Sequence, residues 1–496
     1  MQNRVVYDVV VVGFGAAGAC AAIEAAEAGA RVLVIDRFGA GGATAISGGV
    51  VYAGGGTHCQ RDAGVTDNPE QMYAYLRTET RDAVSPETLR RFCEQSSSML
   101  DWLGNHGVPF DSRLCPDKTS YPTNRHYLYV SGNERPGVPR GHRTRARGTS
   151  GHALHRSLAE AARAAGAEVR SPARAVRLTP DGLECRTLRG WPKLAHRVLH
   201  RLSVKPGLYL PALGRALHRQ VSRIEERYAT SSAIEARAVV IAAGGFVFHR
   251  EMMREHAPLY RRGLRLGTPG DDGSGIRLGV AAGGSVRHLD RVTVWRFLTP
   301  PSALTGGLLV DRDGRRICEP TLYGAAIGDA VLRAPGGRAW LLIDAAVLAA
   351  ARRQVWRQTL WFQRWQAWWM LGPGRVSGAS LDAVARKAGV DPAGLAASGA
   401  VESFVAPFSL IDVSIGARGL PAPMLTLGGL VVDESSGAVS GAVPGVFAAD
   451  RSAVGICSGN YVSGLSLADC VFSGRRAGRH AAAFARTFVR GGSDAH

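Results

Sequence analysis

The chain has 496 residues, of which 46% are hydrophobic, and this is enough for a sizeable core in two domains or in one large domain with an insertion. A formal net charge of +19 suggests an anionic partner, but the Arg residues are dispersed without any RNA- or DNA-binding motif, so we expect no nucleic-acid partner. Eight Cys without metal-ligand spacing predict reduced thiols in a cytoplasmic protein and no metal site. No apolar stretch is long enough to predict a membrane-spanning helix.

The strongest motif lies near the start of the chain. Four Val at 9–12 predict a strand, and Gly13, Gly15 and Gly18 follow it as G-x-G-x-x-G. An Ala-rich helix then leads to a second strand at 31–35. Glycines at these positions permit a tight turn, close approach of the backbone to a pyrophosphate, and close packing of helix on strand. The motif therefore predicts a dinucleotide site.

The residues around this turn supply the expected contacts. The helix begins at about Ala16 and Ala17, and its free N–H groups and dipole favour phosphate. Asp36 ends the second strand, 18 residues after Gly18, where a carboxylate would accept the ribose hydroxyls. A lone G-x-G-x-x-G is weak, but one set between two strands and closed by an acidic residue is specific.

Three later segments accompany the motif: "GAGGATAISGGVVYAGGG" at 39–56, "ARAVVIAAGGF" at 236–246, and "TLGGLVVDESSGAVSGAVPGVFAAD" at 426–450. Together they resemble the flavoprotein family of fumarate reductases, succinate dehydrogenase flavoprotein subunits and ketosteroid dehydrogenases. The resemblance covers most of the chain. It implies an α/β fold, in which a Rossmann-like FAD-binding domain carries an inserted α+β substrate-capping domain.

The resemblance also implies the domain limits. The FAD-binding domain would comprise 1–285 and 424–496, with a basic amphipathic insertion at 190–228, and the capping (catalytic) domain would comprise 286–423.

FAD is the cofactor that the resemblance implies, and its expected contacts come from several segments. They are Gly13, Gly15, Ala16, Ala17, Gly18, Asp36, Arg37, Thr44, Ser47, Gly48, Gly49, Ala243, Gly244, Asp272, Asp450, Ser466 and Leu467. In the respiratory members a His before the Gly-Gly carries the flavin covalently, whereas Gly42 stands there in this chain, so we expect non-covalent FAD. Asp450 stands where the family usually has Gly, and it would either bond the ribityl chain or distort that turn. A helix that begins near Ser466 would direct its N-terminus at the flavin and stabilise negative charge on the reduced ring.

Four residues are the expected catalytic group. Within the family the chain most resembles the Δ4-(5α) type of 3-ketosteroid dehydrogenase, in which a C-terminal Tyr-x-Ser and a capping-domain Tyr face the substrate. Tyr461, Ser463 and Tyr323 match these positions, and Gly464 would contribute a backbone N–H. As a hypothesis, Tyr461 and Gly464 polarise the C3 carbonyl. Ser463, relayed through Tyr323, removes the C4 proton, and the C5 hydrogen leaves as hydride to flavin N5.

Other readings stay open at this point. A Δ1-dehydrogenase would need another Tyr from 110–130, which Tyr121 or Tyr127 would supply. A fumarate-reductase-like enone reductase would need cationic clamps, for which Arg315 and Arg316 are the candidates near the presumed flavin. A membrane-surface protein that keeps FAD only as structure is the non-enzyme alternative.

Two segments combine apolar and basic residues at helical spacing. They are 190–228 and 355–371, and the second holds Trp361, Trp365, Trp368 and Trp369 on or near one face. Trp beside Arg is typical of helices at a membrane interface, but packing on each other or a dimer interface would use the same residues. The expected partners are thus a steroid or similar apolar ketone, an unidentified electron acceptor, and a peripheral membrane contact as one of these alternatives.

Overall fold

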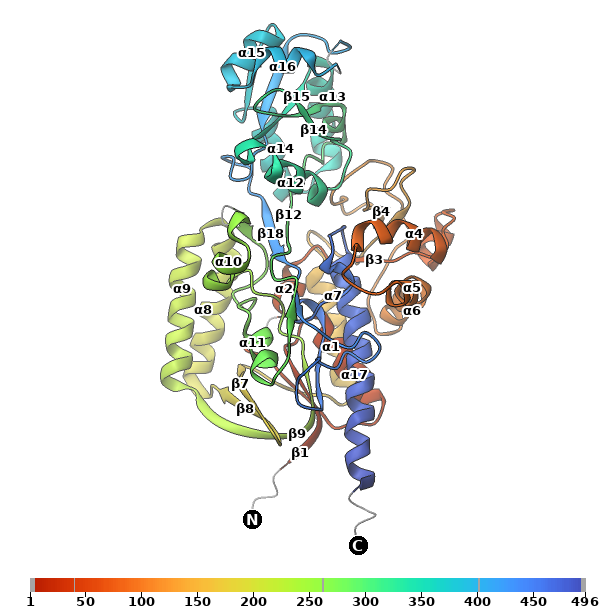
Figure 1. Cartoon of the computed structure of the whole chain (residues 1–496), viewed down its shortest axis with the longest axis vertical. Coiled ribbons are helices and arrows are strands. Elements are labelled where there is room, and N and C mark those ends of the chain that lie inside the picture. Colours follow the sequence, from red (N-terminus) through yellow and green to blue (C-terminus); the bar gives the residue numbers. More distant parts are fainter. Residues whose placement is uncertain (1–4, 40, 261–262, 400–401, 492–496) are drawn as a thin grey trace.

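A computed structural model describes residues 5–39, 41–260, 263–399 and 402–491, and it has two lobes joined by a narrow neck (Figure 1). The described parts of 1–285 and 424–496, the segments expected to form the FAD-binding domain, lie below the upper lobe. Strands at 286–287 and 292–294 pair with strands of 423–430, so the expected limit at 286 stays a prediction.

The lower lobe is built on a seven-stranded sheet. Its order is β6-β2-β1-β9-β8-β7, and β20 pairs with β9 off this path. Strand β1 pairs in parallel with β2 and β9, whereas β7, β8 and β9 form an antiparallel meander. The strands are β1 Val6–Val12, β2 Val32–Ile35, β6 Glu168–Arg170, β7 Ala173–Thr179, β8 Gly182–Thr187, β9 Thr230–Ile241 and β20 Val446–Ala448. The central strands are buried, as their near-continuous Val and Ile predict for a parallel sheet covered on both faces.

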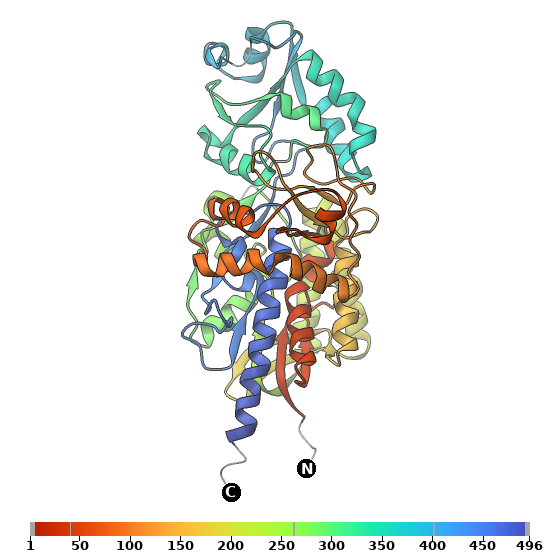
Figure 2. The ribbon, with the colours of Figure 1, turned by 90° about the vertical axis from the view of Figure 1, so that its right-hand side faces the viewer.

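Helices α1 and α17 lie side by side against this sheet (Figures 1 and 2). Both are rich in Ala and Gly, so their backbones approach closely and leave little space between them. The helices of the lower lobe, apart from a hairpin described below, are α1 Ala16–Glu27, α2 Gly42–Ile46, α3 His58–Asp62, α4 Pro69–Thr80, α5 Pro86–Glu94, α6 Ser96–Asn105, α7 Gly151–Ala164, α10 Arg250–His256, α11 Ser274–Ala281 and α17 Leu465–Gly491.

Three small sheets complete the lower lobe and the neck. They are β3-β5-β4 (Val50–Tyr52, Pro139–Arg143, Leu128–Val130), β10-β18-β12 (Leu264–Arg265, Pro423–Thr426, Val292–Val294) and β11-β19 (Val286–Arg287, Gly429–Leu430). Strands β12 and β18 are antiparallel neighbours where the chain leaves and re-enters the lower lobe (Figure 1).

The upper lobe is a five-stranded antiparallel sheet with helices on it. The strand order is β14-β13-β15-β17-β16, with bounds Arg316–Cys318, Leu308–Asp311, Ala339–Ile343, Phe408–Asp412 and Arg375–Gly378. The helices are α12 Gly324–Arg333, α13 Ala345–Gln358, α14 Trp361–Leu371, α15 Leu381–Ala388 and α16 Pro392–Ala397. All of these elements fall within the 286–423 segment. The expected fold class, a Rossmann-like domain with an inserted α+β domain, is confirmed.

The 190–228 segment forms a helical hairpin on one side of the lower lobe, with α8 Gly190–Tyr209 and α9 Pro211–Tyr228 (Figure 1). Buried imidazoles attach it to the chain that follows β2. His200 stacks on Phe38 with ring centroids 3.9 Å apart, and His196 bonds Glu225 at 2.9 Å.

The hairpin histidines predict sensitivity to acid. Burial lowers the pKa of His200 to about 3 and that of His218 to about 4. Below the ordinary histidine pKa of about 6.5, both imidazoles take up a proton in the unfolded chain but not in the folded one. The free energy of unfolding is therefore unaffected by these histidines above that pH and decreases as the pH falls below it. We expect the thermal midpoint to fall between pH 7 and pH 5, and to fall less in H200F/H218L. An equal fall in the variant would show that other groups cause it.

Candidate functional site

The turn between β1 and α1 is made by glycines that no other residue could replace. Gly13 has φ +103°, and a Cβ there would lie 2.4 Å from the carbonyl oxygen of Ala242. A Cβ on Gly18 would lie 1.9 Å from the carbonyl oxygen of Gly13. Gly15 is the N-cap residue of α1. Because glycine has no side chain, the cap residue does not bind the first N–H groups of the helix. This is the cradle that a pyrophosphate needs.

The 42–49 segment packs against this turn. The hydroxyl of Thr44 accepts a bond from the N–H of Ala16 at 2.9 Å. Ser47 donates to the carbonyl of Thr44 at 2.8 Å and accepts from the N–H of Gly49 at 3.1 Å. Tyr121 donates to the carbonyl of Gly48 at 2.7 Å. The predicted cofactor residues of this segment therefore lie together beside the N-terminus of α1, next to Ala17 in its first turn.

Asp36 is held at the end of β2 by backbone donors. Its two carboxylate oxygens accept from the N–H of Phe14 at 2.8 Å and from the N–H of Phe38 at 3.0 Å. These bonds fix the carboxylate at the edge of the glycine turn and leave lone pairs for the hydroxyls of a ribose.

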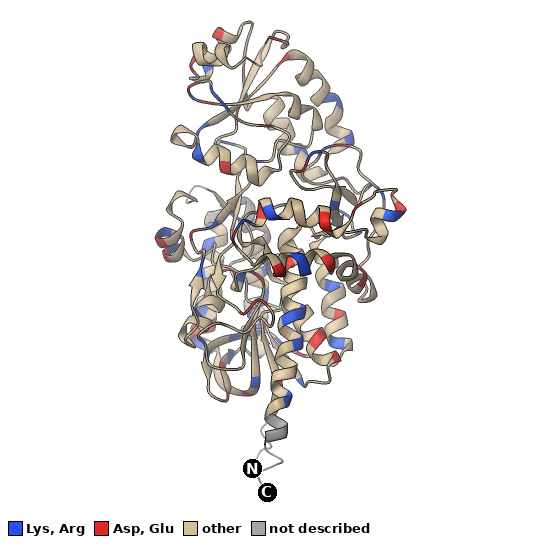
Figure 3. Cartoon of the chain, turned by 45° about the vertical axis from the view of Figure 1, so that its right-hand side comes forward, with Lys and Arg blue, Asp and Glu red and all other residues tan. Residues whose placement is uncertain are grey.

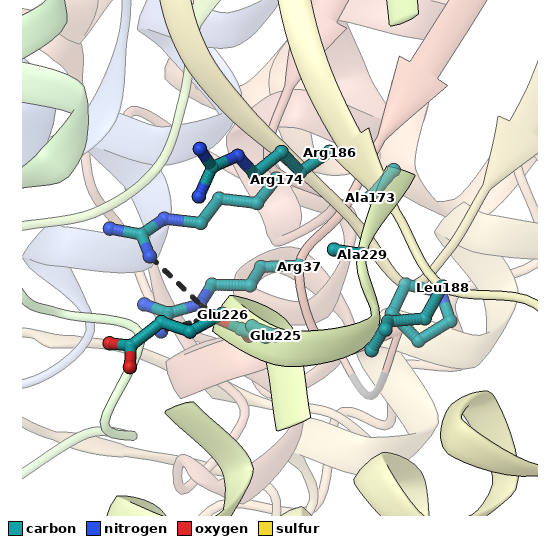
Figure 4. A pocket seen from close by; sticks show the side chains of 9 residues that line it. Arg37, Ala173, Arg174, Arg186, Leu188, Glu225, Glu226 and Ala229 are labelled. Atoms are coloured by element: carbon teal, nitrogen blue, oxygen red, sulfur yellow. Dashed lines mark hydrogen bonds and ion pairs between the residues drawn. The ribbon is translucent and has the colours of Figure 1, made fainter. Parts of the chain in front are cut away.

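Arg37 and Asp272 are engaged with each other. The guanidinium of Arg37 donates to Asp272 and to Glu225 of α9, each at 2.8 Å. Arg174 lies 3.5 Å from Glu225, and Figure 4 shows the side chains of Arg37, Arg174 and Glu225 around a small cavity. The cavity among these side chains is about 20 Å³, which is room for about one water molecule. The contact of Arg37 and Asp272 with the cofactor stays a prediction, since the ion pairs account for both side chains.

The second half of the cofactor site comes from the end of β9 and the chain after β20. The N–H of Ala243 donates to the hydroxyl of Ser452 at 3.0 Å, and that hydroxyl lies 3.0 Å from the carbonyl of Gly244. Asp450 has φ +58°, a conformation that favours glycine and that Asp tolerates better than most residues. Its side chain accepts from the thiol of Cys470 at 3.0 Å. The glycine-like turn is therefore present with Asp in place.

Helix α17 begins immediately after the candidate catalytic loop. Gly464 has φ +89°, and its carbonyl accepts from the N–H of Tyr52 at 3.1 Å. A Cβ on Gly464 would lie 2.7 Å from that nitrogen. The helix starts at Leu465, one residue before the expected start, so Ser466 and Leu467 lie in its first turn as predicted.

Hydroxyl groups from three distant segments meet beside this helix start. Ser463 and Tyr129 of β4 are joined by a buried bond of 2.8 Å between their hydroxyl oxygens. Ser463 also lies within hydrogen-bonding reach of Tyr323, which precedes α12 in the upper lobe. The rings of Tyr323 and Tyr461 lie 6.2 Å apart, and the backbone N–H of Gly464 lies near the Tyr461 hydroxyl and lowers its pKa against the larger effect of burial.

Apolar residues surround these hydroxyls. Trp295 contacts Tyr461 edge to face at 4.9 Å, and Phe297 contacts Tyr323 at 5.9 Å. The same cluster contains Leu266, Leu425 and Leu427. Burial raises the pKa of Tyr129, Tyr323 and Tyr461 above its usual value. All three phenols are therefore neutral near pH 7 and act as hydrogen-bond donors in an apolar enclosure.

The arginines that lie near Trp295 and Tyr323 in the sequence do not contact this cluster of hydroxyls. Arg315 and Arg316, the candidate carboxylate clamps, are exposed, and Arg316 pairs with Glu319. Arg296 stands between Trp295 and Phe297 in the sequence and is buried, but its guanidinium donates to the carbonyls of Leu420 and Ser414, at 2.8 and 2.6 Å. The enclosure suits a neutral ketone better than a dianion.

The sequence did not single out Tyr129. Three tyrosines fall in 110–130, and only the pairing of β4 with β5, and of β5 with β3, brings the Tyr129 hydroxyl to Ser463. Tyr121, one of the two expected there, bonds the cofactor segment instead. Nothing in the local pattern separates these residues.

Comparison with known proteins gives a consistent result. The family model described as FAD binding domain matches residues 8–465. The chain is 37% identical to 3-oxo-5-alpha-steroid 4-dehydrogenase of Comamonas testosteroni over 491 residues, covering 89% of this chain and 92% of the relative. A crystal structure of 3-ketosteroid-delta4-(5alpha)-dehydrogenase from Rhodococcus jostii RHA1 in complex with 4-androstene-3,17-dione superposes with a TM-score of 0.79 at 27% identity, covering 97% and 98% of the two chains.

A 3-ketosteroid delta1-dehydrogenase from Sterolibacterium denitrificans superposes with a TM-score of 0.63 at 16% identity, covering 96% of this chain and 99% of the other, and shows a shared fold. The expectation of FAD as the cofactor is confirmed.

The glycine turn predicts a sharp loss of cofactor in G18A. The new Cβ would strike the carbonyl of Gly13, so the turn must open and the N–H groups of α1 shift away from the pyrophosphate. We expect FAD binding to weaken by at least about tenfold, as measured by quenching of flavin fluorescence. G104A is the control, because a Cβ there meets open space. Unchanged affinity in G18A would contradict the cradle.

Proposed function

Because the chain belongs to the family with the FAD binding domain, we propose that it is a 3-ketosteroid dehydrogenase that desaturates the C4–C5 bond of a 5α-3-ketosteroid. The buried hydroxyl cluster of Tyr129, Ser463, Tyr323 and Tyr461 carries this proposal. The similarity to the Comamonas 4-dehydrogenase over most of both chains supports it.

Tyr461 binds the C3 carbonyl in this proposal. Its phenol is neutral because burial raises its pKa, so it donates a hydrogen bond to the carbonyl oxygen and keeps its proton. The nearby N–H of Gly464 lowers the pKa of the Tyr461 phenol against the effect of burial, which makes the phenol a better hydrogen-bond donor. This pair polarises the carbonyl and acidifies the C4–H bond, as a hydrogen-bond donor to a developing enolate does.

Ser463 receives the C4 proton in this proposal, because its hydroxyl bonds that of Tyr129 at 2.8 Å and lies near that of Tyr323. A serine hydroxyl alone is a poor base, so Ser463 passes its own proton to one of these phenols as it takes the C4 proton, and that phenol releases its own proton to water. The sequence predicted that the proton passes from Ser463 through Tyr323, and the bond to Tyr129 offers a second path.

FAD, when bound, supplies the two-electron acceptor for the C5 hydrogen. The residues that fit it are the glycine turn, Asp36, the 42–49 segment and the start of α17. Gly42 has no side chain that could attach the flavin, which supports non-covalent binding. Tyr121 does not supply the additional Tyr that a Δ1 reaction would need, since its hydroxyl is occupied by the carbonyl of Gly48 and by Arg143. Tyr129 of the same 110–130 segment does lie in the cluster, so the preference for C4–C5 over C1–C2 rests on the similarity to the Comamonas 4-dehydrogenase.

Removing single hydroxyls tests the assignment. We expect Y461F and S463A each to slow flavin reduction by a 5α-3-ketosteroid by about 100-fold or more, and Y129F to slow it less, because Tyr323 remains as the other path. Anaerobic stopped-flow absorbance of the flavin measures these rates. FAD content should stay unchanged, and Y228F, which alters a half-exposed phenol on the hairpin, should match the wild type. A wild-type rate of flavin reduction in both Y461F and S463A would contradict the proposed mechanism.

We propose that α13 and α14 also contact the surface of an anionic phospholipid membrane. Trp356, Trp361, Trp365 and Trp368 are 74, 69, 63 and 53% exposed. Lys and Arg are scattered over both lobes (Figure 3), but the 345–371 stretch holds four Arg and no acidic residue. Trp rings at headgroup depth beside Arg on lipid phosphate are the pattern of an interfacial helix. Trp369 differs from its expected place, since it packs on the core of the upper lobe.

The inner side of α14 reaches the substrate enclosure. Gln366 donates to the carbonyl of Phe297 at 2.9 Å, and Gln363 donates to that of Tyr121 at 3.2 Å. A membrane contact on the outer side would therefore place the enclosure close to the phase in which an apolar ketone dissolves. No helix in the described residues is long and apolar enough to cross a bilayer.

Vesicle sedimentation tests the contact. We expect the wild type to bind vesicles that contain anionic phospholipid, and W361S/W365S/W368S to bind them about tenfold more weakly, because apolar area at the interface is lost. L259S removes an equally exposed apolar side chain outside these helices and should bind like the wild type. If the wild type ignores the vesicles while the triple variant changes the oligomeric state in light scattering, the face is a protein interface.

A further inference from the structure

A buried carboxylate outside the hydroxyl cluster is the point at which three segments of the site meet. Glu79 lies in the last turn of α4 and is 6% exposed. One of its oxygens accepts from the Tyr75 hydroxyl at 2.8 Å and from the side-chain amide of Asn133 at 2.7 Å. The other accepts from the side-chain amide of Asn460 at 2.7 Å. Among the described residues, no Lys or Arg forms an ion pair with it.

Two of these donors lead directly to the candidate catalytic tyrosines. Asn460 immediately precedes Tyr461 in the chain. The side-chain oxygen of Asn133 accepts from the backbone N–H of Tyr323 at 2.6 Å. The Glu79 carboxylate thus ties Tyr461, which belongs to the lower lobe, to Tyr323, which belongs to the upper lobe.

Backbone packing adds to the constraint at the same place. A Cβ on Gly459 would lie 1.9 Å from the carbonyl oxygen of Thr80, the residue that follows Glu79. The catalytic loop therefore rests on the end of α4 without room to shift toward it, and the Asn460–Glu79 bond fixes it in the other directions.

We propose that Glu79 is the positioning residue that sets Tyr461 and Tyr323 at the separation that proton removal from the ketone requires. Within the described part of the chain, Glu79 makes no hydrogen bond with the hydroxyl of Tyr129, Tyr323, Tyr461 or Ser463, so its effect on the tyrosines passes through Asn460 and Asn133. The inference rests on the proposed function, since it concerns the same reaction.

The chemistry of the group explains why it is a carboxylate. An ionised carboxylate only accepts hydrogen bonds, and three donors converge on it. Bonds from neutral donors to an ionised acceptor are shorter and stronger than bonds between neutral groups, which suits a rigid link between two lobes. An uncharged amide in its place would bind the three donors more weakly, and it would keep the bond to Asn460 only if that side chain turned over.

The arrangement allows a test by exchange of partners. N460D places a second carboxylate against that of Glu79 and removes the hydrogen that joined them. We expect flavin reduction by a 5α-3-ketosteroid to slow by about 100-fold, with steroid affinity within about threefold and FAD content unchanged. E79Q should slow the reaction less, because the Asn460 amide can turn over and accept from the new N–H₂ with its oxygen.

The double variant E79Q/N460D restores a donor opposite an acceptor. We expect it to recover at least about tenfold of the rate lost in N460D, which a loss of folding would not allow. A primary isotope effect on flavin reduction by C4-deuterated steroid should be larger in N460D than in the wild type, because proton removal becomes slower. E70Q is the control, since Glu70 is exposed in the first turn of the same helix.

The outcomes separate two failures. A wild-type enzyme that no 5α-3-ketosteroid reduces would overturn the proposed function. A wild type that is reduced, with N460D equal to it, or with an N460D defect that follows loss of FAD and is not relieved by E79Q, would overturn the role of Glu79 alone.

Discussion

The left-handed turn at Gly464 is the constraint on which the site depends. The N–H of Tyr52 donates to the Gly464 carbonyl at 3.1 Å, and a Cβ on Gly464 would lie 2.7 Å from that nitrogen, so a side chain there would strike the backbone. On one side of the turn stand Tyr461 and Ser463, and on the other α17 begins at Leu465. Helix α17 lies along α1 (Figure 1), and in the proposed function the N-terminus of α1 holds the pyrophosphate, so the same turn would place the hydroxyls beside the flavin. A residue with a Cβ at this position would separate the substrate chemistry from the flavin.

Burial then decides what chemistry the hydroxyls can perform. It keeps the phenols of Tyr129, Tyr323 and Tyr461 neutral, and it surrounds them with Trp, Phe and Leu. A neutral donor polarises a ketone in a dry enclosure at lower desolvation cost than a cation would. The charged groups that position the residues of the enclosure lie outside the hydroxyl cluster. Glu79 holds the loops, and Arg296 braces the upper lobe through backbone carbonyls.

Sequence patterns predicted the cofactor half well because its signals are local. The glycine motif, Asp36 and the Ser466 helix each lie in one continuous segment whose conformation follows from its own residues. The substrate half depends on contacts between segments hundreds of residues apart. Tyr129 meets Ser463 only through the β3-β5-β4 sheet, and Glu79 has no motif at all. The matched positions Tyr323, Tyr461 and Ser463 came from the family resemblance, and their meeting gives those matches a physical basis.

The central claim is that the neutral hydroxyl cluster removes a proton beside a ketone so that C4 and C5 are oxidised together. Anaerobic addition of one equivalent of a saturated 5α-3-ketosteroid to the purified FAD protein tests it most directly, with mass and NMR analysis of the steroid released. We predict bleaching of the flavin and a 4-en-3-one as the first product. A 1-en-3-one as the first product, or a flavin that stays oxidised with this substrate, would contradict the account.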